Sequence, residues 1–307
     1  MRKFDVICKI AVIACNVVIL GALCGCSDFV TNGINGKFHD SSLIGGMGED
    51  LSGYEIGNAE INDSISNLDI EWIAGKVTVD YHDADTIVIE ESSNITLDDK
   101  DKLRYIVENG TLKVRFCEHS VRTFNLSKSL VVTLPKDASY GEIKIDGVSS
   151  DFVFPTITAG ELDIDTVSGS VNCDDVNVTG AVNFDATSGD FNIKNSIKAE
   201  SLDTDAVSGG IYINNASVAN GIRTNSTSGN IEIVLADMCN IDTDGVSASV
   251  KLDVPEDASF VLGYDTVSGS LSMKSNAQIQ GDEYQVGDGK YKVNVNTTSG
   301  NLDVLTH

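Results

Sequence analysis

The chain has 307 residues, of which 46 are Asp or Glu and only 21 are Lys or Arg, so its formal net charge is −25. A surface this acidic repels nucleic acid and anionic lipid head groups, which excludes nucleic acid as a partner. Cys117, Cys173 and Cys239 are too widely spaced for a zinc-binding pattern, and no stretch after the first 25 residues has sustained helical periodicity.

Residues 1–25 have the features of an export signal. A basic start precedes a mostly apolar run over residues 10–23, which is too short to span a membrane comfortably. The run ends in the sequence LCGC, which resembles the lipobox of bacterial lipoproteins and implies cleavage before Cys26 and a diacylglycerol anchor on its thiol. We therefore expect an extracytoplasmic lipoprotein held at the lipid bilayer of a bacterial cell surface. An uncleaved anchor helix or an ordinary signal peptide is the alternative.

Two segments separate the predicted signal from the repeats. Residues 26–62 are rich in Gly, Asn, Ser and Asp, which predicts a flexible tether, with an amino-terminal cap as the alternative. Residues 63–128 alternate apolar and polar side chains, and Asn109-Gly110 suits the tight turn of a hairpin. We expect this second segment to form a β-rich cap or irregular first coils, because a solenoid needs its first coil covered.

Residues 129–307 contain a repeat of about twenty residues, marked by a serine that is usually followed by glycine. A recurrence of this length predicts stacked coils, and the alternating apolar residues make the fold an all-β, single-stranded β-solenoid or β-helix. Successive serines are separated by 19, 20, 20, 20, 19, 21 and 31 residues. They are Ser149, Ser168, Ser188, Ser208, Ser228, Ser247, Ser268 and Ser299.

Side-chain alternation predicts which positions of each coil face the core. With the serine as position zero, position −6 is always aliphatic and position −2 is small, so we assign these positions and the serine to the inside. The apolar positions then shift to +3 and +5, which predicts a corner at the glycine, where the serine hydroxyl is expected to bond open backbone groups. Eight such serines, with no histidine between His119 and His307, predict no catalytic residue.

Acidic side chains recur at positions −3 and −5 and, by the same alternation, face outward. Neighbouring strands of a stack lie about 4.8 Å apart, so carboxylates in successive coils repel each other. Solvent, turn hydrogen bonds, an uncharged coil such as the one with Asn225, or bound calcium would relieve this repulsion. We expect no cofactor other than weakly bound calcium. The candidate metal ligands are Asp163, Asp165, Asp185, Asp203, Asp205, Asp242 and Asp244.

The interval between Ser268 and Ser299 is about ten residues longer than the others. Its sequence predicts an inserted hairpin around Gly287-Asp288-Gly289, with a binding loop as the alternative. The last coil ends at Leu305, so we expect its strand edge to be exposed at the carboxyl end of the solenoid.

Several of these segments together resemble a bacterial extracytoplasmic domain family of unknown function that carries the name "putative adhesin". The resemblance covers about residues 65–305. It depends on the segments GKVTV, GTLKVRF and SLVVTLPKDASYGEIKIDGVSSD and on the repeated motifs TVSG, ATSGD, AVSGG and STSGN. It implies a β-solenoid displayed at a cell envelope, and it supplies no catalytic residues.

The sequence favours a non-enzymatic surface lipoprotein whose rigid acidic face binds a glycan or a host or envelope protein. Rows of identical outward side chains suit a ligand that is itself repetitive. One alternative is an envelope scaffold or stress-signalling partner that binds another membrane protein through an exposed coil end. The other is a polysaccharide lyase or hydrolase, for which Arg223 in the −5 row is the residue to test.

Overall fold

The computed structural model describes residues 50–118, 126–274 and 277–307. These residues form β-strands joined by turns and by two short 3-10 segments, η1 (Leu51–Gly53) and η2 (Asp99–Asp101), which confirms the all-β prediction. No helix in the described part of the chain is long and apolar enough to cross a membrane. The predicted signal sequence, Cys26 and the predicted tether up to residue 49 lie outside the described residues.

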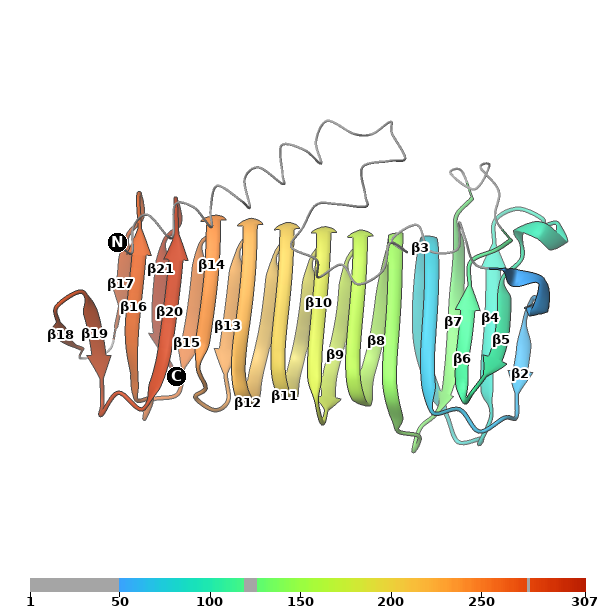
Figure 1. Cartoon of the computed structure of the whole chain (residues 1–307), viewed down its shortest axis with the longest axis horizontal. Coiled ribbons are helices and arrows are strands. Elements are labelled where there is room, and N and C mark those ends of the chain that lie inside the picture. Colours follow the sequence, from blue (N-terminus) through green and yellow to red (C-terminus); the bar gives the residue numbers. More distant parts are fainter. Residues whose placement is uncertain (1–49, 119–125, 275–276) are drawn as a thin grey trace.

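The strands stack into a flattened solenoid with two sides (Figure 1). In each coil, the strand before the corner lies on side A and the strand after it lies on side B. Side-A strands pair in parallel with the repeat in register, so that Ser188 lies opposite both Ser168 and Ser208. Side-B strands also pair in parallel with one another. This arrangement confirms the predicted single-stranded β-solenoid.

Eight strands build the central coils, and three of them turn a corner and so belong to both sides. The eight are β8 (Tyr140–Ser168), β9 (Val171–Val178), β10 (Ala181–Ser188), β11 (Phe191–Ser208), β12 (Ile211–Ser228), β13 (Ile231–Leu235), β14 (Ile241–Ser247) and β15 (Val250–Val254).

The core between the two sides is built from the predicted apolar columns. Position −6 on side A and positions +3 and +5 on side B are buried in the central coils, because neighbouring coils cover them on both sides. Phe184 on side A and Phe191 on side B stack with ring centroids 4.4 Å apart. Cys117, Cys173 and Cys239 are buried free thiols, and burial raises the pKa of each.

The predicted inward orientation of the serines is wrong, because all eight side chains are exposed. The chain begins to turn before the serine, so strict alternation ends at position −2. The glycine then completes the corner: Gly189 has a φ of +140°, and a Cβ there would lie 1.9 Å from Gly169 O. Gly189 N donates to the carbonyl of the next coil at 3.0 Å, so the corner backbone is paired without a serine hydroxyl. The exposed serines are Ser149, Ser168, Ser188, Ser208, Ser228, Ser247, Ser268 and Ser299.

The solenoid has a regular coil inside the predicted cap region. This coil is β3 (Asn67–His82), in which Ala74 takes the serine position opposite Ser149 and Gly75 forms the corner with a φ of +113°. The next coil along the chain packs on the outer side of β3, whereas β8 packs on its inner side. The first two coils are therefore out of sequence order. The outer coil consists of β6 (Thr111–Arg115) and β7 (Lys128–Pro135).

Antiparallel strands cover the amino-terminal end on both sides. On side A, β5 pairs with β6 and β1 pairs with β5, while on side B, β4 pairs with β7 and β2 pairs with β4. β5 and β6 form the hairpin predicted at Asn109-Gly110. The predicted tether boundary at residue 62 is wrong, because residues 50–62 form η1, β1 and β2. The four covering strands are β1 (Glu55–Ile56), β2 (Ala59–Ile61), β4 (Ile87–Ser93) and β5 (Arg104–Glu108).

The last two coils are also out of sequence order. The coil of β20 and β21 inserts between the coil of β14 and β15 and the coil of β16 and β17. Leu305 therefore lies in an internal coil, and the predicted exposed edge at that residue is wrong. β19 and β18 extend side A beyond β16 (Figure 1). These strands are β16 (Phe260–Thr266), β17 (Leu271–Met273), β18 (Gln278–Gln280), β19 (Glu283–Val286), β20 (Tyr291–Thr297) and β21 (Leu302–Thr306).

The hairpin in the long interval lies at a different turn from the one predicted. β18 and β19 pair around Gly281, which has a φ of +67°. Gly287 and Gly289 instead connect β19 to β20, which lie on opposite sides of β16 and do not pair with each other. This connection passes the start of β16, where Asp288 N donates to Ser259 Oγ at 3.1 Å.

Candidate ligand-binding face

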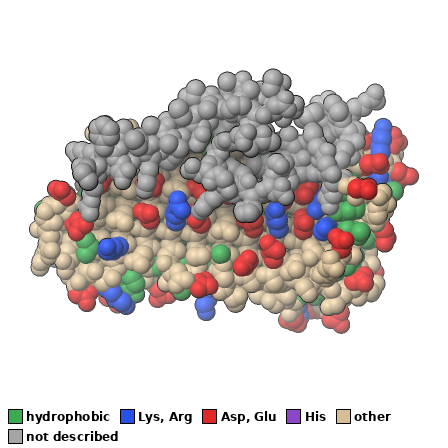
Figure 2. All heavy atoms as spheres, in the orientation of Figure 1, with side chains coloured by type: hydrophobic (Ala, Val, Ile, Leu, Met, Phe, Trp, Pro, Cys, Tyr) green, Lys and Arg blue, Asp and Glu red, His purple; other side chains and the backbone are tan. Residues whose placement is uncertain are grey.

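The outer face of side A carries three parallel columns of repeated side chains. Positions −5 and −3 hold mainly carboxylates and amides, and position −1 holds Val or Thr. All three are partly or fully exposed, as predicted for the acidic rows. The register places successive members beside each other, as in Asp165, Asp185 and Asp205. Figure 2 shows acidic side chains along the visible face, with Lys and Arg between them.

The central carboxyl groups of the −3 column have strongly perturbed acidity. Partial burial, and then the neighbouring carboxylates, raise the pKa of Asp165 and of Asp185 to about 7. Burial is also the main cause that raises the pKa of Asp163 and of Asp146. Because their pKa lies near neutral, the Asp165 and Asp185 carboxyl groups can carry a proton at neutral pH, so the column can donate as well as accept hydrogen bonds.

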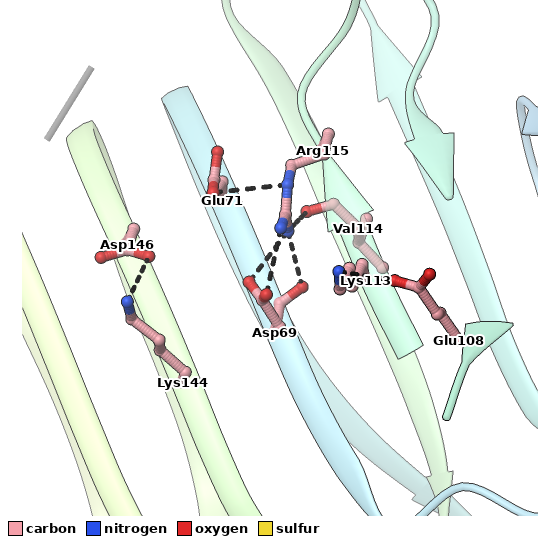
Figure 3. Close-up of polar contacts among 8 residues, drawn as sticks. All are labelled: Asp69, Glu71, Glu108, Lys113, Val114, Arg115, Lys144 and Asp146. Atoms are coloured by element: carbon pink, nitrogen blue, oxygen red, sulfur yellow. Dashed lines mark hydrogen bonds and ion pairs between the residues drawn. The ribbon is translucent and has the colours of Figure 1, made fainter. Parts of the chain in front are cut away.

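The amino-terminal end of the columns is neutralised by basic side chains (Figure 3). Arg115 donates from Nη1 to Asp69 Oδ1 at 2.9 Å and from Nη2 to Asp69 Oδ2 at 3.0 Å, and its Nε lies 3.3 Å from Glu71 Oε1. Lys144 Nζ lies 3.6 Å from Asp146 Oδ2. In the described part of the chain, these three acids are the one group whose ligand atoms converge within 4.8 Å. Arg115 and Lys144 already supply the positive charge that a metal ion would bring.

One coil, with Arg223 and Asn225, interrupts the carboxylates further along the columns. Arg223 Nη1 lies 3.8 Å from Asp203 Oδ2, and its side chain is 49% exposed. Asn225 donates its side-chain amide to Asp205. These contacts account for Arg223 as a charge neutraliser, and they do not set one carboxylate pair apart from the others for glycoside hydrolysis.

The structure divides the seven candidate metal ligands into two groups on either side of the Arg223 coil. Beyond that coil the acids again alternate with amides, and Asn296 Nδ2 donates to Asp244 Oδ1 at 2.8 Å. Within the described residues, none of the seven belongs to a set of three whose oxygen atoms converge within 4.8 Å. Calcium binding stays a prediction. The first group is Asp163, Asp165, Asp185, Asp203 and Asp205, and the second is Asp242 and Asp244.

The Val and Thr column at position −1 is not singled out by reasoning from the acidic rows. Its signal is the residue before each serine in the motifs TVSG, ATSG, AVSG and STSG. Along the outer face of side A, starting at the corner, most coils thus present a serine hydroxyl, then a β-branched Val or Thr, and then a carboxylate or amide. The half-buried members of the column are Val148, Val167, Thr187, Val207, Thr227, Val246 and Thr298.

The two described histidines lie away from these columns. His82, at the side-B end of β3, has its Nε2 2.6 Å from Thr86 O. His307 follows β21 on side B, and its Nδ1 lies 3.0 Å from Asp253 Oδ1. Of these two, neither is placed to act as a general base for a serine of side A.

Comparison with known proteins identifies a family for most of the chain. The family model described as Toastrack DUF4097 matches residues 65–305, which confirms the resemblance predicted from the repeats. No match was found among curated proteins.

Three solved structures that this chain matches are named for adhesion. A "putative adhesin" from Bacteroides fragilis NCTC 9343 is 12% identical with a TM-score of 0.50, over 82% of this chain and 97% of that chain. This likeness shows the fold alone. A "putative adhesin" from Parabacteroides distasonis ATCC 8503 is 13% identical, with a TM-score of 0.44 over 82% and 97%. A "putative cell adhesion protein" from Clostridium sporogenes ATCC 15579 is 11% identical, with a TM-score of 0.24 over 82% and 100%.

Proposed function

The chain belongs to the Toastrack DUF4097 family, and from that premise we propose that it is a non-enzymatic adhesion module displayed on a bacterial cell surface. Its lipid anchor is on Cys26, and the outer face of side A binds a repetitive glycan. The adhesion name of the Bacteroides fragilis protein, which has a similar fold, supports binding to surface molecules in general.

The observation that carries this proposal is the in-register repetition of outward side chains. Eight serine-containing coils, stacked at about 4.8 Å, make a face about 40 Å long. Most coils offer a hydroxyl, a Val or Thr, and a carboxylate or amide at the same places, so a repetitive ligand meets similar contacts along its length. Multiple weak contacts of this kind add up to firm attachment when several engage together.

The chemistry of the face defines the class of glycan. Carboxyl and amide groups bond sugar hydroxyls, and Asp165 and Asp185, whose pKa lies near neutral, can both donate and accept. The Val and Thr column provides apolar contact for the faces of sugar rings. A chain with a net charge of −25 repels acidic polysaccharides, so the ligand is a neutral or amine-bearing glycan.

A glycan array probed with the purified chain tests the ligand. We expect the double variant Asp165→Ala/Asp185→Ala to weaken binding at least tenfold. The matched double variant Asp174→Ala/Asp303→Ala removes two carboxylates from side B and should leave binding within twofold of the original. The proposal fails if no glycan binds and a deletion strain adheres to surfaces as well as its parent.

The anchor is tested separately by metabolic labelling with an alkyne fatty acid. We expect Cys26→Ser to abolish the label and release the chain from the membrane fraction. Cys24→Ser is the matched control, since it removes a neighbouring thiol, and it should retain the label. Equal labelling of both variants would show that the anchor is elsewhere.

A further inference from the structure

At the carboxyl end of the solenoid, side A extends further than side B. β19 and β18 continue side A beyond β16, whereas the last described strand of side B is the three-residue β17. Inward side chains on the added strands therefore have no described layer opposite them. Leu262 of β16 is fully buried and Tyr284 of β19 is partly buried. Ile279 of β18 pairs with Tyr284, so it points to the same side, yet it is 73% exposed.

The outer edge of β17 has backbone groups that no described strand pairs with. Lys274 N donates to Val304 O of β21 at 3.2 Å, so the even-numbered residues of this segment turn their backbone groups toward β21. Because alternate residues of a strand bond to opposite sides, the N–H and C=O groups of Leu271 and Met273 point outward. An open edge beside partly exposed apolar side chains suits the addition of a strand.

The amino-terminal end of the same molecule shows what completes such an edge. There, β4 pairs antiparallel with β7 on side B, and its alternating Ile87 and Ile89 are buried. Just after β7, Lys136 forms an ion pair with Asp83, which precedes β4. Lys274 holds the comparable place just after β17, and it is exposed. The missing strand is therefore apolar at alternate positions, with an acidic residue near its amino-terminal end.

We propose that Leu271, Met273, Tyr284 and Ile279, here called the apolar step, dock an extended segment of a partner protein that adds antiparallel to β17. Alternate apolar residues of the segment cover the apolar step, and an acidic residue pairs with Lys274. Backbone hydrogen bonds to β17 supply affinity, and the apolar contacts supply specificity. This surface is separate from the acidic columns, so the inference stands independently of the glycan proposal.

The test uses a synthetic peptide with the sequence of residues 83–91, DADTIVIEE, because this strand covers the comparable edge at the other end. We expect saturable binding to the intact chain and slower hydrogen exchange at the amides of Leu271 and Met273. The same peptide with serine in place of both isoleucines should not bind. If the first peptide does not bind, or protects other amides only, the proposal is overturned.

Two variants connect binding to this edge. Met273→Pro removes an outward N–H but no hydrogen bond to β21, and we expect it to lower the affinity for the peptide at least tenfold. Ile279→Ser removes part of the apolar step and should lower the affinity several-fold. Ile95→Ser is the matched control, since Ile95 is 57% exposed at the opposite end, and it should leave the affinity unchanged. An unchanged urea midpoint shows that each variant is folded.

A second copy of the chain is the competing occupant. Pairing of two copies through β17 would give a concentration-dependent dimer in sedimentation velocity, which Met273→Pro would abolish. That result would overturn the assignment to a partner protein. We expect a monomer, because a three-residue strand offers few hydrogen bonds to its copy and two chains of net charge −25 repel each other.

Discussion

Both ends of the solenoid have a coil out of sequence order and added antiparallel strands, but the two ends differ in how far these strands cover the core. At each end one coil is out of sequence order, and antiparallel strands continue the stack beyond it. At the amino-terminal end these strands extend both sides, and Leu134, Ile87 and Ile61 of β7, β4 and β2 are all 4% exposed or less. At the carboxyl end, within the described residues, only side A is extended, and its strands β16, β19 and β18 finish with the exposed Ile279. Among the described strands, these outer isoleucines are thus buried at the end where both sides are extended and exposed at the end where one side is extended.

The largest expected difference in unfolding free energy between the two ends comes from replacing one lysine at each end. Lys128 is fully buried, its Nζ lies 2.7 Å from Glu91 Oε2, and Glu91 Oε1 accepts from Leu103 N at 2.8 Å. Lys128→Met leaves a buried carboxylate without its cation, so we expect a loss of about 3–5 kcal/mol in unfolding free energy, measured in urea. Lys274→Met at the other end should change it by less than about 0.5 kcal/mol.

A double variant distinguishes loss of the ion pair from loss of packing. Adding Glu91→Leu to Lys128→Met removes both charges, and we expect most of the lost stability to return. If the single variant is nearly as stable as the original chain, the buried pair is not what holds the amino-terminal end together.

Two glycines contrast the stacked corners with the free turn of the carboxyl end. A Cβ at Gly189 would lie 1.9 Å from the carbonyl of the adjacent coil, whereas a Cβ at Gly281 would meet nothing within 4 Å. Gly189→Ala combines an unfavourable φ with a clash against backbone, and we expect it to cost about 3 kcal/mol or more. Gly281→Ala should cost only about 1 kcal/mol, from its positive φ alone. Equal losses in thermal unfolding would contradict the tight stacking of the corners.

Two isoleucines on outermost strands test the contrast in burial directly. Ile61 of β2 is 4% exposed and Ile279 of β18 is 73% exposed. Ile61→Ala removes buried methyl groups and leaves a cavity, so we expect a loss of about 2–4 kcal/mol in urea unfolding. Ile279→Ala should stay within about 0.5 kcal/mol of the original chain. A large loss at Ile279 would mean that side B is covered at that end too.

The regular part of the fold could be predicted because each coil carries its own signals. An aliphatic residue at position −6 and a glycine at +1 mark a strand and a corner, and the constant spacing brings equal positions together in register. The outward aspartates followed from the same alternation. Residues 63–128 were predicted as a cap or irregular first coils, and the regular coil of β3 was not recognised because Ala74 replaces the serine that marks the other coils.

The serine orientation and the coil order could not be predicted from these patterns. Alternation counts residues along a strand, but it does not show where the turn begins, and a shift of one position moves a side chain from inside to outside. The coils resemble one another in sequence, so their repeats do not show which coil lies beside which. The order depends on the connecting segments 83–110 and 277–290, whose strands pair with the outermost coils. The raised pKa of Asp165 depends on burial, which spacing alone does not measure.

The smallest expected effect is on the pH dependence of stability, and it comes from the centre of the acidic columns rather than from their amino-terminal end, where Arg115 and Lys144 compensate the carboxylates. The pKa of Asp165 and of Asp185 is raised to about 7, so the folded chain binds more protons than the unfolded chain between about pH 4 and pH 7. Stability should therefore fall as the pH rises through this window, with a Tm a few degrees lower at pH 8 than at pH 5. Asp165→Asn/Asp185→Asn should reduce this difference. Asp174→Asn/Asp303→Asn should preserve the difference. If both double variants reduced it equally, general charge repulsion rather than the two raised pKa values would be the cause.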